Sequence, residues 1–152
     1  MISDIDTILD ERVDPFDLEK SRYDYEKQVG RGSPSSLTTF IYANALIRST
    51  KEDVHEGINL LEKLLHDEPD NGAKRDYVYH LAIANARLKD YDRALAYIDA
   101  LLTHEQSNRQ AQRLKEVIEK KMRKEGLIGA AIVGTGALVL GGLAALLFAG
   151  RK

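Results

Sequence analysis

Apolar residues recur three or four positions apart through the first 125 residues, which is the spacing of one face of an α-helix. Val54, Ile58, Leu61 and Leu65 form one such stripe, and no sustained stretch alternates apolar and polar residues as a half-buried strand does. The pattern therefore predicts an all-α fold. The expected helices span about 4–12, 15–28, 34–49, 54–66, 73–88, 91–104 and 107–125.

Polar residues suited to helix starts mark several of these boundaries. Asp14-Pro15 has the form of an N-cap followed by a first-turn proline. Asp53-x-x-Glu56 and Ser107-x-x-Gln110 have the form of capping boxes, in which side chains bond the free donors of the first turn. The Asn71-Gly72 pair is predicted to interrupt the helical run.

The sequence aligns with itself at an offset of 37 residues, which indicates a repeated pair of antiparallel helices. Tyr42 then falls on Tyr79, and Gly57 falls on Ala94. The second pair fits the 34-residue tetratricopeptide pattern when started at Arg75. We therefore expect a six-helix tetratricopeptide-like bundle over 15–125, with repeats at about 38–71 and 75–108 and flanking helices that cap the exposed ends.

The first helix of each tetratricopeptide repeat lines the concave side, which generally binds a peptide or helix. The consensus positions predict a partner-binding groove made by Thr39, Tyr42, Leu46, Ser49, Asp76, Tyr79, Ile83, Ala86 and Arg87. The tyrosines and aliphatic residues would be apolar anchors, and the Arg87 guanidinium would bind a carboxylate or carbonyl. The alternative is that Tyr42 and Tyr79 only pack between helices.

The arm that precedes the repeats, residues 1–14, has Ile5, Ile8 and Leu9 at helical spacing. One hypothesis is that this segment lies in the groove as an autoinhibitory competitor of the partner. The alternative is a helix that packs elsewhere on the bundle.

An uncharged run occupies 127–150 and consists of 24 residues, mostly apolar with six glycines. A helix of that length reaches roughly 36 Å, against roughly 30 Å for the hydrocarbon core of a membrane. The run predicts one C-terminal transmembrane helix, and only two residues follow it. The chain is therefore expected to be tail-anchored, with its N-terminal domain in the cytoplasm.

Basic residues flank this predicted anchor on both sides, as is typical of mitochondrial and peroxisomal tail anchors. The more numerous charges before it favour keeping the N-terminal side in the cytoplasm. The predicted targeting flank comprises Lys120, Lys121, Arg123, Lys124, Arg151 and Lys152. Small residues four positions apart, such as Ala137, Gly141 and Ala145, suggest homo-oligomers through the membrane helix. The competing explanation is that glycine and alanine only moderate the hydrophobicity of the segment.

Composition removes several function classes. A net charge of −2 argues against a nucleic-acid partner, and the absence of cysteine excludes disulfides and thiolate metal sites. The four histidines lack metal-ligand spacing, and Gly30-Arg31-Gly32 has no phosphate-loop context. The sequence predicts no enzyme, no metal, no cofactor and no small-molecule substrate.

Three stretches resemble the mitochondrial fission 1 family, whose members are tail-anchored tetratricopeptide-like adaptors. They are RDYVYHLAIANARLKDYDRALAYIDALL at 75–102, NRQA at 108–111 and EKKMRKEGLIGAAIVG at 119–134. ERVDPFDLEK at 11–20 and EGINLLEKLL at 56–65 are similar to the first helix and first repeat of the family. Ala86 departs from the family, which commonly has an aromatic residue there.

The resemblance implies a protein on the cytosolic face of the mitochondrial outer membrane, and of peroxisomes in some members. It also implies a role in organelle fission, by recruiting or regulating a dynamin-related GTPase or its adaptors. The alternative function is a co-chaperone or targeting receptor that binds a chaperone tail through a clamp of Lys, Arg and Asn. The predicted groove offers only Arg87 for such a clamp, with Asn44 and Asn85 nearby. A purely structural anchor is a third possibility.

Overall fold

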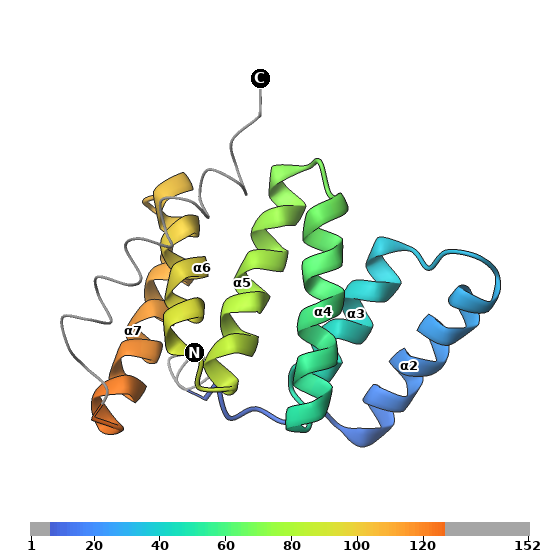
Figure 1. Ribbon diagram of the computed structural model, residues 1–152, viewed down its shortest axis with the longest axis horizontal. Coiled ribbons are helices and arrows are strands. Elements are labelled where there is room, and N and C mark those ends of the chain that lie inside the picture. The colour runs from blue at the N-terminus through green and yellow to red at the C-terminus, as the bar shows by residue number, and fades with distance from the viewer. Residues whose placement is uncertain (1–6, 127–152) are drawn as a thin grey trace.

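The computed structural model describes residues 7–126, and within that range the chain forms six α-helices (Figure 1). These helices are α2 (Pro15–Gly30), α3 (Ser36–Leu46), α4 (Lys51–Asp67), α5 (Asn71–Arg87), α6 (Tyr91–His104) and α7 (Arg109–Lys124). They follow one another across the molecule in chain order, and each packs against the next. The predicted all-α bundle of two helix pairs with flanking helices is confirmed.

Each of the six helices begins with a polar side chain that accepts a hydrogen bond from a first-turn amide. Asp14 caps α2 as predicted, with its carboxylate 2.8 Å from the amide of Phe16. Three other predicted starts were wrong. Thr50 caps α4, three residues before Asp53, and Asn108 caps α7 in place of Ser107. Asn71-Gly72 forms the first turn of α5 because Asp70 caps that helix.

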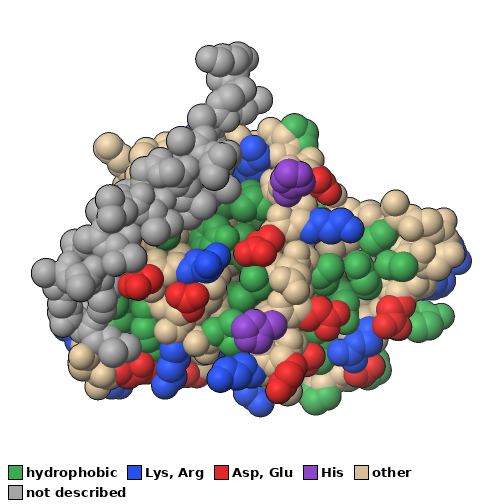
Figure 2. All heavy atoms as spheres, viewed as in Figure 1, with side chains coloured by type: hydrophobic (Ala, Val, Ile, Leu, Met, Phe, Trp, Pro, Cys, Tyr) green, Lys and Arg blue, Asp and Glu red, His purple; other side chains and the backbone are tan. Residues whose placement is uncertain are grey.

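The core is aliphatic and continuous through α4, α5, α6 and α7. Its largest fully buried side chains include Leu61, Leu81, Ile98, Leu101, Leu114 and Ile118. Each such side chain contributes about 1.5–3 kcal/mol to folding relative to an exposed position. On the face drawn in Figure 2, acidic and basic side chains are interspersed around smaller apolar areas.

The 37-residue alignment reproduces burial at some equivalent positions of the two helix pairs but not at others. In α4 and α6, the equivalent residues Leu61 and Ile98 are both fully buried. In α3, Ile41 is 51% exposed, whereas Val78, its equivalent in α5, is fully buried. A single offset of 37 residues therefore predicts the wrong burial for part of α3.

The N-terminal arm is not helical where the structure describes it. Residues 7–10 form a turn in which the Asp10 amide donates to the Thr7 carbonyl at 2.9 Å, and residues 11–14 continue without helical structure. The helix predicted over 4–12 is therefore wrong for residues 7–12. The arm runs along one edge of the bundle, beneath α5 and α4, to the start of α2 (Figure 1).

The predicted anchor at 127–150 and the tail at 151–152 lie outside the described residues. Between residues 7 and 126, no helix has both the length and the hydropathy needed to cross a membrane.

Candidate partner-binding surface

Two large apolar side chains lie uncovered on one side of α3. Leu37 is 68% exposed and Ile41 is 51% exposed, and they are one helical turn apart. The residues beside them contact the two neighbouring helices. Thr38 accepts a hydrogen bond from Gln28 of α2 at 2.9 Å, and the ring of Phe40 packs edge-on against His80 of α5 at 5.1 Å. The pair therefore faces outward between α2 and α5, and we call it the α3 stripe.

The groove residues predicted in the first repeat lie mainly inside the bundle. Thr39, Tyr42 and Leu46 are buried, and Ser49 is half-buried. The Tyr42 hydroxyl accepts from Arg22 of α2 at 3.2 Å and donates to Glu56 of α4 at 3.3 Å. Burial is the main cause that raises the pKa of Tyr42 above its ordinary value. Tyr42 thus joins three helices, as the packing alternative describes.

The groove residues predicted in the second repeat divide in the same way. Tyr79, Ile83 and Ala86 are buried, Asp76 is exposed, and Arg87 is half-buried. Burial raises the pKa of the Tyr79 hydroxyl, and the nearby Gln110 of α7 opposes this shift.

Of the nine predicted groove residues, Ser49 and Arg87 line one pocket beside the arm, and Asp76 and Tyr79 line another pocket between α5, α6 and α7. Partner contact by the nine residues stays a prediction. Leu37 and Ile41 were missed because the repeat register placed them away from the concave side. Their exposure depends on which helices pack against α3, and no local pattern in the sequence predicts those neighbours.

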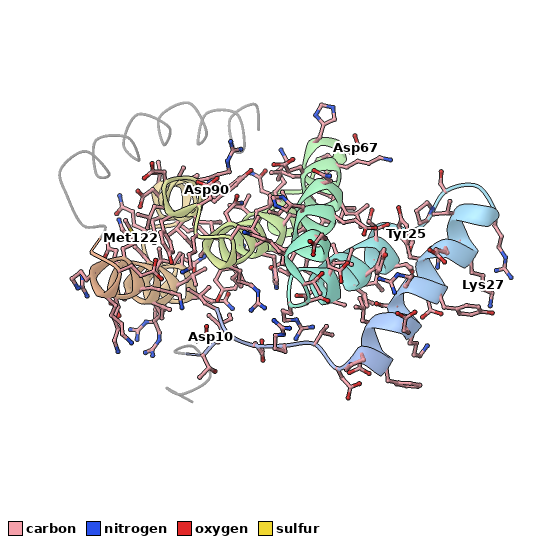
Figure 3. The ribbon with its side chains drawn as sticks, turned by 60° about the horizontal axis from the view of Figure 1, so that its bottom comes forward. Asp10, Tyr25, Lys27, Asp67, Asp90 and Met122 are labelled. Carbon is pink, nitrogen blue, oxygen red and sulfur yellow. The ribbon has the colours of Figure 1, made fainter. Side chains whose placement is uncertain are left out.

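The arm is held against the ends of three helices. Leu9 is only 6% exposed and joins the main core, and Ile8 packs beside it. The Arg87 guanidinium donates to the Ile8 carbonyl at 3.4 Å, and the Val13 amide donates to the Arg48 carbonyl at 2.9 Å. Figure 3 shows this path from Asp10 toward α2. Ile5, the third predicted arm residue, lies outside the described range.

Ion pairs add to the fixing of the arm. The Asp10 carboxylate lies 3.5 Å from the Lys121 ammonium of α7, and the Glu11 carboxylate lies 3.8 Å from the Arg48 guanidinium. Both pairs are partly exposed, so each contributes at most about 1 kcal/mol. The arm thus contacts α3, α5 and α7, and these include the first helix of each repeat.

The basic residues of the predicted targeting flank lie on the last two turns of α7. Lys120, Arg123 and Lys124 are exposed, and Lys121 is half-buried under the arm. With Leu9 and Asp10 they line a pocket of about 530 Å³ between the arm and α7. Arg151 and Lys152 lie outside the described residues. No cluster of three His, Cys, Asp or Glu residues in the described part of the chain could hold a metal ion.

Relatives cover almost the whole chain. The FIS1-related protein fis-2 of Caenorhabditis elegans is 54% identical over 150 residues, which are 98% of this chain and 99% of that protein. The mitochondrial fission 1 protein of Homo sapiens is 43% identical over 144 residues, or 94% of each chain. The chain belongs to the mitochondrial fission 1 family. Residues 75–127 also match the family model of the Fis1 C-terminal tetratricopeptide repeat.

Solved structures of the family share this fold. Yeast Fis1, solved in complex with an Mdv1 fragment that contains an N-terminal extension and a coiled coil, superposes with a TM-score of 0.69. It is 30% identical, and the match covers 78% of this chain and 92% of that one. Fis1 from Saccharomyces cerevisiae gives a TM-score of 0.67. The predicted tetratricopeptide-like fold is confirmed, and the family is one of mitochondrial fission adaptors rather than a known enzyme family.

Proposed function

We propose that the chain is a mitochondrial outer-membrane receptor that recruits a dynamin-related GTPase or its adaptors through a surface formed by the first helices of its two pairs, α3 and α5. Anchoring by residues 127–150, with the bundle in the cytoplasm, is part of this proposal, as is a share on peroxisomes. The observation that carries it is the α3 stripe, since exposed apolar residues on a helix surface can anchor a partner segment. The complex of yeast Fis1 with an Mdv1 fragment supports it.

The test is rescue of mitochondrial morphology in cells that lack their own mitochondrial fission 1 protein. Ile41→Asp, alone or with Leu37→Asp, should fail to restore fragmented mitochondria, because a charge on the stripe opposes burial by a partner. Phe16→Asp is the matched control, because Phe16 is 74% exposed but lies on α2. Equal rescue by the wild-type chain and both Asp variants would remove the α3 stripe as the recruiting surface.

The arm is proposed to gate the predicted partner-binding groove. Its contacts with Arg48 and Arg87 place it across the ends of α3 and α5, beside the predicted groove residues Ser49 and Arg87. Deleting residues 1–12 should raise partner affinity, because docking of the arm competes with docking of the partner. Leu9→Ser is a milder variant that weakens docking without shortening the chain. Unchanged affinity in both variants would leave the arm as a packing element only.

The co-chaperone alternative has less support in the geometry. A clamp for a chaperone tail needs several accessible amides and cations on the concave helices. Asn85 is buried, and its amide donates to the Leu81 carbonyl at 2.7 Å. Binding of a chaperone C-terminal peptide with an affinity that falls on Arg87→Ala would favour this second function.

A further inference from the structure

A second pocket lies on the other side of the arm and has a volume of about 330 Å³. Its walls come from three parts of the chain that are far apart in sequence. The arm contributes Leu9, Asp10 and Arg12, the start of α4 contributes Lys51, and the end of α5 contributes Arg87. The arm therefore forms one wall, and the bundle forms the others.

Three cations line this pocket, and no carboxylate between residues 7 and 126 forms an ion pair with any of them. They are Arg12, Lys51 and Arg87. The two carboxylates of the arm that precede Arg12 are already paired, Asp10 with Lys121 of α7 and Glu11 with Arg48. The pocket thus concentrates positive charge although the chain as a whole carries −2.

Arg87 is the member whose environment is least favourable for a charge. It is half-buried, and its one described hydrogen bond is the 3.4 Å contact with the Ile8 carbonyl. Burial lowers the pKa of Arg87, and repulsion from Arg12 and Arg48 lowers it further, against opposing effects of Asp10 and Glu11. A guanidinium has five donors, so most of its hydrogen-bonding capacity is unused by the arm.

We propose that this pocket binds a phosphate group, either as the free ion or as a phosphate monoester. A phosphate carries about −1.5 to −2 charges at neutral pH and three strong acceptor oxygens, so it suits three cations better than a single carboxylate does. Arginine forks bind phosphate oxygens in pairs, and two arginines face this pocket. The volume is ample for a phosphorylated side chain.

Bound phosphate would join the arm to the bundle, because Arg12 belongs to the arm and Lys51 and Arg87 belong to the helices. A ligand that binds only the docked arrangement stabilises it by mass action. Phosphate would therefore hold the arm down, which makes the position of the arm depend on the anion. The site itself is independent of which partner the α3 stripe binds.

The test is a titration of the full-length chain in a phosphate-free maltoside detergent, at pH 7.5 and constant ionic strength. The ligands are inorganic phosphate, O-phosphoserine and acetate. Their binding is measured by calorimetry and by the NMR signals of the Leu9 methyl groups. We expect saturable one-to-one binding that shifts the Leu9 signals. Arg12→Gln and Lys51→Gln, both exposed positions, should each weaken phosphate binding at least fivefold, while Lys27→Gln on α2 should not.

Tighter binding of phosphoserine would assign the site to a modified side chain, and tighter binding of inorganic phosphate would assign it to the free ion. The proposal is overturned if acetate binds as tightly as phosphate. It is also overturned if binding does not saturate, or if Lys27→Gln weakens it as much as the two pocket variants do.

Discussion

The two helix pairs have the same architecture but use their first helices differently. In α5, residues 81–86 are all buried, because the helix is surrounded by α4, α6, α7 and the arm. In α3, Leu37 and Ile41 remain exposed because no described helix covers that side. One pair therefore leaves an apolar surface exposed, and the other supplies the centre of the core. The number of neighbours around a repeat decides between these roles.

The pairs also differ in how closely their helices approach. A Cβ atom added to Gly57 of α4 would lie 2.6 Å from the Ile47 side chain and 3.1 Å from the Ala43 carbonyl oxygen. The equivalent position in α6 is Ala94, which is fully buried with its methyl group in place. The first pair thus needs a glycine where the second accepts a methyl group.

The largest effect should come from the core of the second pair. Leu81→Ala removes a fully buried side chain of α5 and should lower the free energy of unfolding by roughly 2–5 kcal/mol. Denaturant titration measures it. The folded variant should keep its partner affinity, because Leu81 is fully buried in the core and is not part of the α3 stripe. A loss of affinity without a loss of stability would contradict the division between the pairs.

A smaller effect is expected at the closest helix contact. Gly57→Ala should destabilise the fold by about 1–3 kcal/mol, although alanine favours helix, because neither the buried Ile47 side chain nor the backbone can move away cheaply. Gly30→Ala is the control, since nothing lies within 4 Å of its added Cβ. The melting temperatures of both variants measure this effect. A Gly57→Ala variant that is more stable than the wild-type chain would show that α3 and α4 can separate freely.

The second pair is also tied to the end of α7, just before the predicted anchor. The buried Tyr91 hydroxyl lies 3.1 Å from each carboxylate oxygen of Glu125, and Lys89 lies 3.5 Å from the same group. Burial and Glu125 raise the pKa of Tyr91 to about 12. Tyr91→Phe should cost roughly 1.5 kcal/mol. Chemical denaturation should show no such loss for the exposed control Tyr23→Phe.

The smallest effect should appear at the boundary between the pairs, where His80 of α5 packs on Phe40 of α3. Burial lowers the pKa of His80 below 6.5, against the opposing effect of Asp76, while Arg48 lowers it further. The unfolded chain therefore takes up this proton first, and stability should decline as pH falls below about 6.5. Melting temperatures at pH 7.5 and 5.5 should differ less for His80→Phe than for the wild-type chain. Equal differences would exclude His80 as a cause.

Much of the fold could be predicted from apolar spacing, because helices such as α4 and α6 bury one continuous stripe. Boundaries were less predictable, since Thr50 and Asp53 are equally good caps and only packing selects between them. The α3 stripe was not predictable from the repeat register. Exposure of Ile41 depends on which helices surround it, whereas the register assumes that both pairs have equivalent neighbours.

The docked arm shows a similar limit. Ile8 and Leu9 were identified from their apolar character, yet their periodicity suggested a helix where the structure has a turn and an extended segment. The contacts with Arg48, Arg87 and Lys121 join positions about 35 to 110 residues apart in the sequence. The spacing of apolar residues within a short segment carries no information on contacts between such distant positions.

The most direct test of the central claim is a binding titration of the full-length chain with a fission-adaptor fragment of the kind bound to yeast Fis1. Wild type, Ile41→Asp and Phe16→Asp would be compared in the same detergent. Burial of one aliphatic anchor by a partner predicts at least a tenfold loss of affinity for Ile41→Asp, with Phe16→Asp unchanged. Full affinity of a folded Ile41→Asp variant would contradict the assignment of the first helix pair as the recruiting surface.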